Sequence, residues 1–329
     1  MNRRQFVSLS ASVVMALPCA AQAQRTEKLP VIGVLWHAAN AEEEAPFRGP
    51  LREGFTNLGY VEGKNIVFEE RYPDEQPERF HSLAADLVRL KVDVLLAVSN
   101  LSALAAQRTT STIPIVFCPC TDPLYLKLVS SLARPGGNIT GRSFMTDDII
   151  AKRLQIFKEA LPHLSRVALL VNPNFAHDMR RAIADNQSAA DRLHIAVEVV
   201  EAGAPEELER AFSTIAEGHF DAVIVSHTAL YFIVRGRIAA LALAHGLPTL
   251  APTGLFTEAG ALLAYGPHQP TLMRGCALYV DKILKGAKPA DLPVQQPTDF
   301  ELVVNLKTAK ALGITLPPSI LFQADKVIQ

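Results

Sequence analysis

The chain has 329 residues, of which 49% are hydrophobic and 20% are charged, and its formal net charge is −1. This length exceeds one ordinary hydrophobic core and predicts two domains. A charge so close to zero does not favour nucleic acid or an anionic membrane surface as a partner, so we expect neither.

Residues 1–23 have the features of an export signal. Arg3 and Arg4 precede an apolar stretch, and Ala21-Gln22-Ala23 has the A-x-A pattern of a cleavage site. The apolar stretch is too short to span a membrane. The paired arginines fit a twin-arginine (Tat) signal, and an ordinary Sec signal is equally consistent with them. We therefore expect a periplasmic protein, cleaved after Ala23.

Apolar strands and amphipathic helices alternate in the next part of the chain. The predicted strands cover residues 31–35, 66–70, 92–98 and 113–117. A further helix is predicted after Asp122-Pro123, because proline suits the first helical position and aspartate suits the N-cap. This alternation is typical of a doubly wound α/β unit with a parallel sheet.

The alternation restarts after a Pro-Gly-Gly-Asn sequence. Strands are predicted at 166–171, 195–201, 221–225, 247–251, 261–265 and 300–304, and a helix at 269–285. The fold class is therefore α/β, with two doubly wound parallel-sheet lobes joined by a hinge. We expect residues 29–140 and 266–297 to form lobe 1, residues 141–265 and 298–329 to form lobe 2, and the hinge to include Asn138, Thr140 and Gly141.

Three cysteines, Cys118, Cys120 and Cys276, follow the predicted cleavage site. Because three is an odd number, at least one of them lies outside any intramolecular disulfide. No cluster of histidine or further cysteine accompanies Cys118 and Cys120, as a zinc site would require. We expect no metal site and no cofactor.

Candidate ligand contacts follow the predicted strands, because open α/β sheets bind ligands beyond the carboxyl ends of their strands. These positions hold small polar groups and aromatic rings, without a nucleophile beside a base. Such a composition suits a cleft that recognises a small polar molecule. The expected ligand contacts are Trp36, His37, Ser99, Asn100, Thr121, Asp122, Asn172, Asn174, His227, Thr228, Thr253 and Tyr265.

Asp122 has two possible roles. It could accept a hydrogen bond from a ligand ammonium group, while Ser99, Asn100 or Thr121 donates toward a carboxylate. It could instead cap the predicted helix, which would contribute about 1 kcal/mol to stability.

Other candidates also have structural alternatives. Trp36 could stack on the ligand or cover the edge of the sheet. Tyr265 could place its ring against the ligand or pack at the hinge. Asn172 and Asn174 flank a proline in a common turn signal. The two histidines of the set could contact the ligand or be solvated turn residues.

Three segments, residues 55–65, 112–141 and 279–313, resemble extracytoplasmic solute-binding proteins of ABC transporters, in the branch with tryptophan/tyrosine-type binding proteins. The resemblance implies a type I periplasmic-binding-protein-like fold with three crossings between the lobes. It also implies a monomer that captures a small solute, such as an amino acid or related carboxylated metabolite, for an ABC permease. A sensory protein that presents its ligand to a receptor or kinase is the alternative. We expect no enzymatic activity, and the sequence lacks a G-x-S-x-G elbow.

The chain departs from this family at Tyr125 and Lys127, where relatives usually have glycine. If these side chains enter the cleft, we expect a smaller or more acidic solute than tryptophan or tyrosine.

Overall fold

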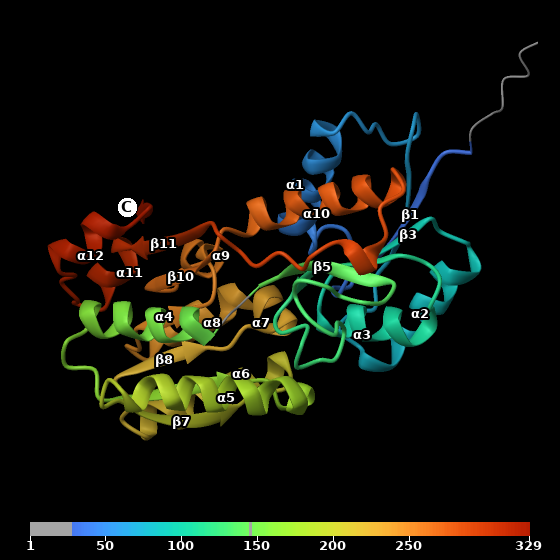
Figure 1. The fold of residues 1–329 in the computed structure, drawn as a ribbon. Helices are drawn as coiled ribbons and strands as arrows, with labels where there is room; N and C mark the ends of the chain where they lie inside the picture. The colour runs from blue at the N-terminus through green and yellow to red at the C-terminus, as the bar shows by residue number, and fades with distance from the viewer. Residues whose placement is uncertain (1–27, 145–146) are drawn as a thin grey trace, which may run out of the picture.

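The computed structural model describes residues 28–144 and 147–329, which form two α/β lobes (Figure 1). The predicted export signal lies outside the described residues. Within the described part of the chain, none of the helices combines the length and apolar character that crossing a membrane requires.

Lobe 1 contains a five-stranded parallel sheet in the order β2-β1-β3-β4-β5. The central strands β3 and β4 are buried along their whole length, as expected for apolar runs covered on both faces. The strands are β1 (Val31–Leu35), β2 (Val67–Arg71), β3 (Val94–Ala97), β4 (Ile115–Cys120) and β5 (Ile139–Ser143).

Helices cover both faces of this sheet, with α1 (Ala45–Asn57) and α10 (Gln269–Leu284) on one face and α2 (Pro77–Arg89) and α3 (Asn100–Thr109) on the other (Figure 1). A Cβ atom at Gly54 would lie 2.5 Å from the carbonyl oxygen of Arg274, so this glycine allows α1 and α10 to approach closely.

A disulfide between Cys118 and Cys276 joins β4 to α10. Cys120 is buried and takes no part in this bridge, which agrees with the expectation that at least one cysteine lies outside it. Because α10 follows lobe 2 in the sequence, the disulfide fixes a late segment of the chain to the sheet of lobe 1.

Lobe 2 contains a seven-stranded sheet in the order β12-β11-β10-β9-β8-β6-β7. All neighbouring strands are parallel except β10 and β11, which are antiparallel. The strands are β6 (Arg166–Val171), β7 (Ala196–Glu201), β8 (Ala222–Val225), β9 (Thr249–Ala251), β10 (Leu263–Pro267), β11 (Phe300–Asn305) and β12 (Lys326–Ile328).

The helices of lobe 2 connect these strands and pack on the sheet (Figure 1). They are α4 (Asp147–Ala160), α5 (Ala176–Asp191), α6 (Leu208–Glu217), α7 (Ala229–Ile233), α8 (Arg235–Ala244), α9 (Gly254–Glu258), α11 (Leu306–Ala311) and α12 (Pro318–Gln323).

Within residues 28–329, three connections between the described elements cross from one lobe to the other. The first crossing follows β5, the second joins β10 to α10, and the third joins a short 3-10 helix at Pro289–Asp291 to β11. Between β10 and β11 the chain therefore runs through lobe 1 and back, and the two strands pair in opposite directions.

The prediction of a helix after Asp122-Pro123 is wrong, because residues 123–127 form a turn and residues 128–132 have no regular secondary structure. The N–H of Leu126 donates to the carbonyl oxygen of Asp122 (3.1 Å), but no regular helix continues from there. Lys127 has a φ of +56°, in the left-handed region, which a right-handed helix excludes.

The three expected hinge residues lie inside lobe 1. Asn138 precedes β5, and its side chain donates to the carbonyl oxygen of Ile113 (2.7 Å). Thr140 and Gly141 are part of β5, so the predicted boundary between residues 140 and 141 falls within a strand. At Gly141, a Cβ atom would collide with the carbonyl oxygen of Phe117. The chain leaves the sheet of lobe 1 only after β5.

Candidate functional site

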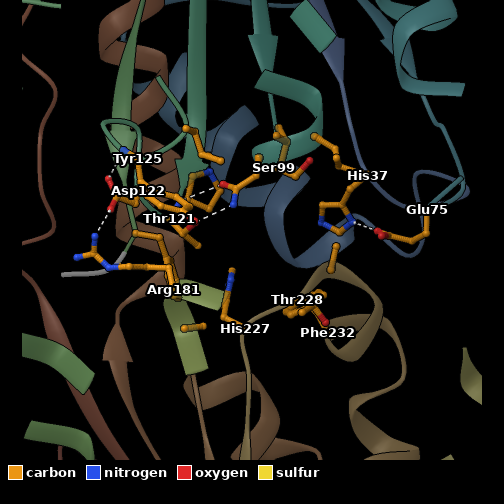
Figure 2. A pocket seen from close by; sticks show the side chains of 18 of the residues that line it. His37, Glu75, Ser99, Thr121, Asp122, Tyr125, Arg181, His227, Thr228 and Phe232 are labelled. Carbon is orange, nitrogen blue, oxygen red and sulfur yellow. Dashed lines mark hydrogen bonds and ion pairs between the residues drawn. The ribbon is translucent and has the colours of Figure 1, made fainter. Parts of the chain in front are cut away.

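A cavity of about 150 Å³ lies between the two lobes, at the carboxyl ends of their strands (Figure 2). Apolar and aromatic side chains make up much of its lining, together with a few polar groups. Seven of the expected ligand contacts line it, and their contact with a ligand stays a prediction. They are His37, Ser99, Asn100, Thr121, Asp122, His227 and Thr228.

The wall from lobe 1 follows the edge of its sheet. Because the strand order is β2-β1-β3-β4-β5, the segments after these strands place Glu75, His37, Ser99, Thr121 and Phe144 in that order along the cavity. The parallel arrangement brings all five strand ends to the same edge.

Ser99 connects β3 to α3 and caps that helix. Its Oγ accepts a hydrogen bond from the N–H of Ser102 (3.2 Å). Its φ of +128° is rare for a residue with a side chain and stores backbone strain. This strained turn places Ser99 and the first turn of α3 on the cavity wall.

Asn100 links the segments that follow β3 and β4. Its Nδ2 donates to Thr121 Oγ1 (2.7 Å), and the N–H of Thr121 donates to its Oδ1 (3.0 Å). Asn100 therefore positions Thr121 as well as lining the cavity itself.

Asp122 uses its two carboxylate oxygens differently. Oδ1 accepts hydrogen bonds from the N–H groups of Leu124 (3.1 Å) and Tyr125 (2.9 Å), which stabilises the turn. Oδ2 lies 3.8 Å from Nη1 of Arg181, which belongs to α5 of lobe 2 (Figure 2). Nε of Arg181 also donates to Asp185 (3.0 Å to Oδ2). One end of the cavity is thus bordered by a charged contact between the lobes.

The opposite end holds a buried histidine between two carboxylates. Nδ1 of His37 lies 3.0 Å from Glu75 Oε1 and 3.4 Å from Glu44 Oε1. The backbone N–H groups of His37 and Ala38 also donate to Glu44 Oε1 (2.9 and 2.8 Å). Burial by itself lowers the pKa of His37, but Glu44 and Glu75 more than offset it and raise this pKa to about 9. His37 is therefore an imidazolium at neutral pH.

Aromatic rings from both lobes surround this end. The ring of His37 meets the edge of Phe47 (5.4 Å between centroids) and lies 6.5 Å from Phe232 of lobe 2. Phe47 and Phe232 also contact each other across the cleft (4.4 Å). Phe80 lines the same cavity.

His227 of lobe 2, unlike His37, is uncharged at neutral pH. Its ring stacks on Phe144 with a centroid separation of 4.0 Å. Burial, the charge of Arg153 and the charge of His37 lower its pKa to about 3, so His227 is neutral at neutral pH. The next residue, Thr228, caps α7 by accepting a hydrogen bond from the N–H of Tyr231 (3.2 Å).

The other five expected contacts lie away from the cavity. Trp36 is fully buried and its Nε1–H donates to Glu70 (3.1 Å), so its ring packs in the core. Asn172 accepts a hydrogen bond from the N–H of Asn174 (3.0 Å), and Asn174 Nδ2 donates to the carbonyl oxygen of Gly203 (2.8 Å), as in a turn. Thr253 is fully buried, next to α9, and Tyr265 stacks on Phe300 (6.0 Å).

Of the two large side chains that replace glycine, only one reaches the cavity. Tyr125 lines it, and the guanidinium of Arg181 lies 5.9 Å from its ring. Lys127, the cation that would favour a more acidic solute, is exposed and outside the lining. The condition for a smaller or more acidic solute, entry of both side chains into the cleft, is therefore not fulfilled. The left-handed φ of Lys127 explains why glycine suits this position.

Several lining residues were not predicted from the sequence, among them Glu75, Phe80, Arg181 and Phe232. Glu75 follows β2 in a turn where Asp74 and Glu75 both have positive φ. The Pro-Asp pair before Glu75 is a sequence signal for this turn. Within the described residues, no group of three histidine, cysteine or carboxylate side chains is placed to hold a metal ion.

Residues 29–328 match the model of a family described as ABC transporter substrate binding protein. The chain is also similar to the tyrosine-binding protein of Clostridioides difficile (strain R20291), with 27% identity over 277 residues, 82% of this chain and 79% of that protein.

Two solved structures have similar folds. A conserved domain protein from Vibrio cholerae O1 biovar El Tor str. N16961 has a TM-score of 0.85 and 27% identity, covering 91% of this chain and all of that one. The ABC domain in complex with L-Trp from Streptococcus pneumoniae has a TM-score of 0.85 and 22% identity, covering 92% of this chain and all of that one. The predicted two-lobed α/β fold is confirmed.

Proposed function

Because the chain belongs to the ABC transporter substrate-binding protein family, we propose that it is an exported receptor that captures an aromatic amino acid between its lobes for an ABC permease. The family consists of solute-binding proteins, not of enzymes.

The observation that carries this proposal is the lining of the interlobe cavity, which contains aromatic rings and, apart from them, polar groups. Phe47 of lobe 1 and Phe232 of lobe 2 provide apolar surface at one end, and Phe80 of lobe 1 adds apolar surface to the lining. A protein cavity of about 150 Å³ accommodates a ring the size of benzene. An apolar lining with a few polar groups is typical of small-molecule sites.

The middle of the cavity and its other end suit the charged groups of an amino acid. A carboxylate is stabilised by hydroxyl donors and by the N–H groups at the start of a helix, which Ser99, Thr121 and the first turn of α3 supply. Asp122 supplies an acceptor for an ammonium group. The tyrosine-binding relative and the structure in complex with L-Trp support the same ligand class.

The cavity also explains how binding would close the lobes. A ligand favours the closed arrangement only if it contacts both lobes there. His227, Thr228 and Phe232 line the cavity from lobe 2, opposite Ser99 and Thr121 of lobe 1 (Figure 2).

A thermal-melting screen of residues 24–329 against single L-amino acids and small sugars tests this proposal. Phenylalanine, tyrosine or tryptophan should raise the melting temperature, because a ligand at 100 times its Kd stabilises the folded protein by about 2.7 kcal/mol. Phe322→Ala is the matched control, since Phe322 is exposed on α12 and outside the cavity, and it should retain the full shift. A shift with sugars or acidic amino acids, and none with aromatic ones, would contradict the proposal.

A further inference from the structure

His37 is a buried hydrogen-bond donor whose second ring nitrogen remains available. Its side chain is only 6% exposed and lines the cavity. Nδ1 is occupied by Glu75 and Glu44. Within residues 28–144 and 147–329, Nε2 has no hydrogen-bond partner. The protonated ring therefore retains one N–H, in a place that is largely closed to solvent.

The charges around His37 favour an uncharged acceptor for this N–H. Glu44 and Glu75 lie against the ring, and Glu43 adds a further negative charge nearby. Burial raises the pKa of Glu44, and the charge of His37 and the hydrogen bonds from the backbone N–H groups of Ala38 and His37 only partly counteract this. A ligand carboxylate would have to be buried close to these carboxylates, and a ligand ammonium would meet the imidazolium. A hydroxyl oxygen accepts the hydrogen bond without adding charge.

The surroundings indicate that this acceptor is carried by a ring. Phe47 and Phe232 pack around His37, and Phe80 lines the same cavity. Such a shell suits an apolar ring with one polar substituent.

The spacing of the strands sets where this substituent would lie. His37 follows β1, and Thr121 and Asp122 follow β4, with β3 between them. Two strand spacings correspond to about 10 Å. A phenyl ring that forms hydrogen bonds at both ends, through its amino acid group and a para substituent, bridges this separation.

We propose that His37 is a specificity-determining residue, whose Nε2–H donates a hydrogen bond to a para hydroxyl on the aromatic ring of the ligand. Glu44 and Glu75 are positioning residues that hold the imidazole in place and protonated. The proposal rests on the proposed function and deepens it, because it selects a phenol over an unsubstituted ring. Phenylalanine would leave the buried N–H unpaired, which costs about tenfold or more in affinity.

Calorimetric titration of the purified protein with L-tyrosine, L-phenylalanine and the meta-hydroxyl isomer of tyrosine tests this inference. L-tyrosine should bind about tenfold or more tightly than either of the other two. In His37→Leu, the ratio between tyrosine and phenylalanine should fall to about one, since no donor remains to be left unpaired. Asp74→Asn is the matched control: Asp74 lies in the same turn as Glu75, outside the cavity lining, so the ratio should stay as in the wild type.

Other outcomes would contradict either this inference or the proposed function on which it rests. Equal affinity for tyrosine and phenylalanine in the wild type overturns the inference and leaves the proposed function intact. A preference for tyrosine that persists in His37→Leu would show that another group recognises the hydroxyl, which overturns the inference. If His37→Leu does not fold, equal binding of the para and meta isomers by the wild type still overturns the inference. Binding of no aromatic amino acid contradicts the proposed function itself.

Discussion

The two cavity histidines carry different charges because their neighbours differ. His37 lies against the carboxylates of Glu44 and Glu75, which raise its pKa to about 9. His227 stacks on Phe144, has no carboxylate partner among the described residues, and has its pKa lowered to about 3, mainly by burial. The cleft therefore presents one cationic and one neutral ring at neutral pH.

These pKa values predict opposite effects on the pH dependence of stability. For His37, stabilisation is fully present below the unfolded pKa of about 6.5 and is lost as the pH rises through about 9. For His227, the unfolded chain binds a proton that the folded protein does not bind, so stability falls as the pH drops from about 6.5 to about 3. Urea denaturation across this range should show a shallower alkaline decline in His37→Gln and a shallower acidic decline in His227→Gln. Unchanged slopes in both variants would contradict these charge states.

Side-chain direction explains which candidate residues line the cavity. The rule that ligands bind beyond strand ends placed His37, Ser99 and Thr121 on the cavity. Trp36 directly follows β1, and its ring joins Ile32 and Val34 in one core, as the two-residue period of a strand implies. Partners that come from elsewhere in the chain, such as Glu75, depend on tertiary contacts that no local pattern contains.

At the scale of elements, the side chain of Asn100 holds together the segments that follow β3 and β4. Asn100, the first residue of α3, makes two hydrogen bonds with Thr121 after β4. Asn100→Ala should therefore weaken ligand binding about tenfold and lower the free energy of unfolding by about 1–2 kcal/mol. Asn65→Ala is a matched control, because Asn65 also ties a turn with two hydrogen bonds, to Val61 and Gly59. It should lower stability similarly, as measured by urea denaturation, and leave the calorimetric Kd unchanged. Equal Kd values for Asn100→Ala and the wild type would contradict the role of Asn100.

Strands with a continuous apolar sequence were predictable, and β5, whose sequence ITGRS contains polar residues, was not. Apolar runs predicted β1 and β6 at their observed residues, because buried parallel strands need continuous apolar sequence. The segment that forms β5 was interpreted as part of a hinge, because it follows a Pro-Gly-Gly-Asn sequence after which the alternation of strands and helices restarts. Its backbone is nevertheless buried by pairing with β4 and by the contact of Gly141 with Phe117.

At the scale of the molecule, one apolar core contains residues of both lobes. Phe47 of lobe 1 and Phe232 of lobe 2 belong to this core and contact each other beside the cavity. At the other end, Asp122 and Arg181 approach each other across the cleft, with both side chains partly exposed. An exposed ion pair contributes less than about 1 kcal/mol, so we attribute most of the closing free energy to the aromatic contacts and the ligand.

The central claim is that an aromatic amino acid binds between the lobes and contacts both. The most direct measurement is calorimetric titration of L-tyrosine into the wild type, Phe47→Ala in lobe 1 and Phe232→Ala in lobe 2. We predict one ligand per chain, a negative heat-capacity change from burial of the ring, and a loss of about tenfold or more in affinity in each variant. Wild-type affinity in either variant would contradict a site shared by the two lobes.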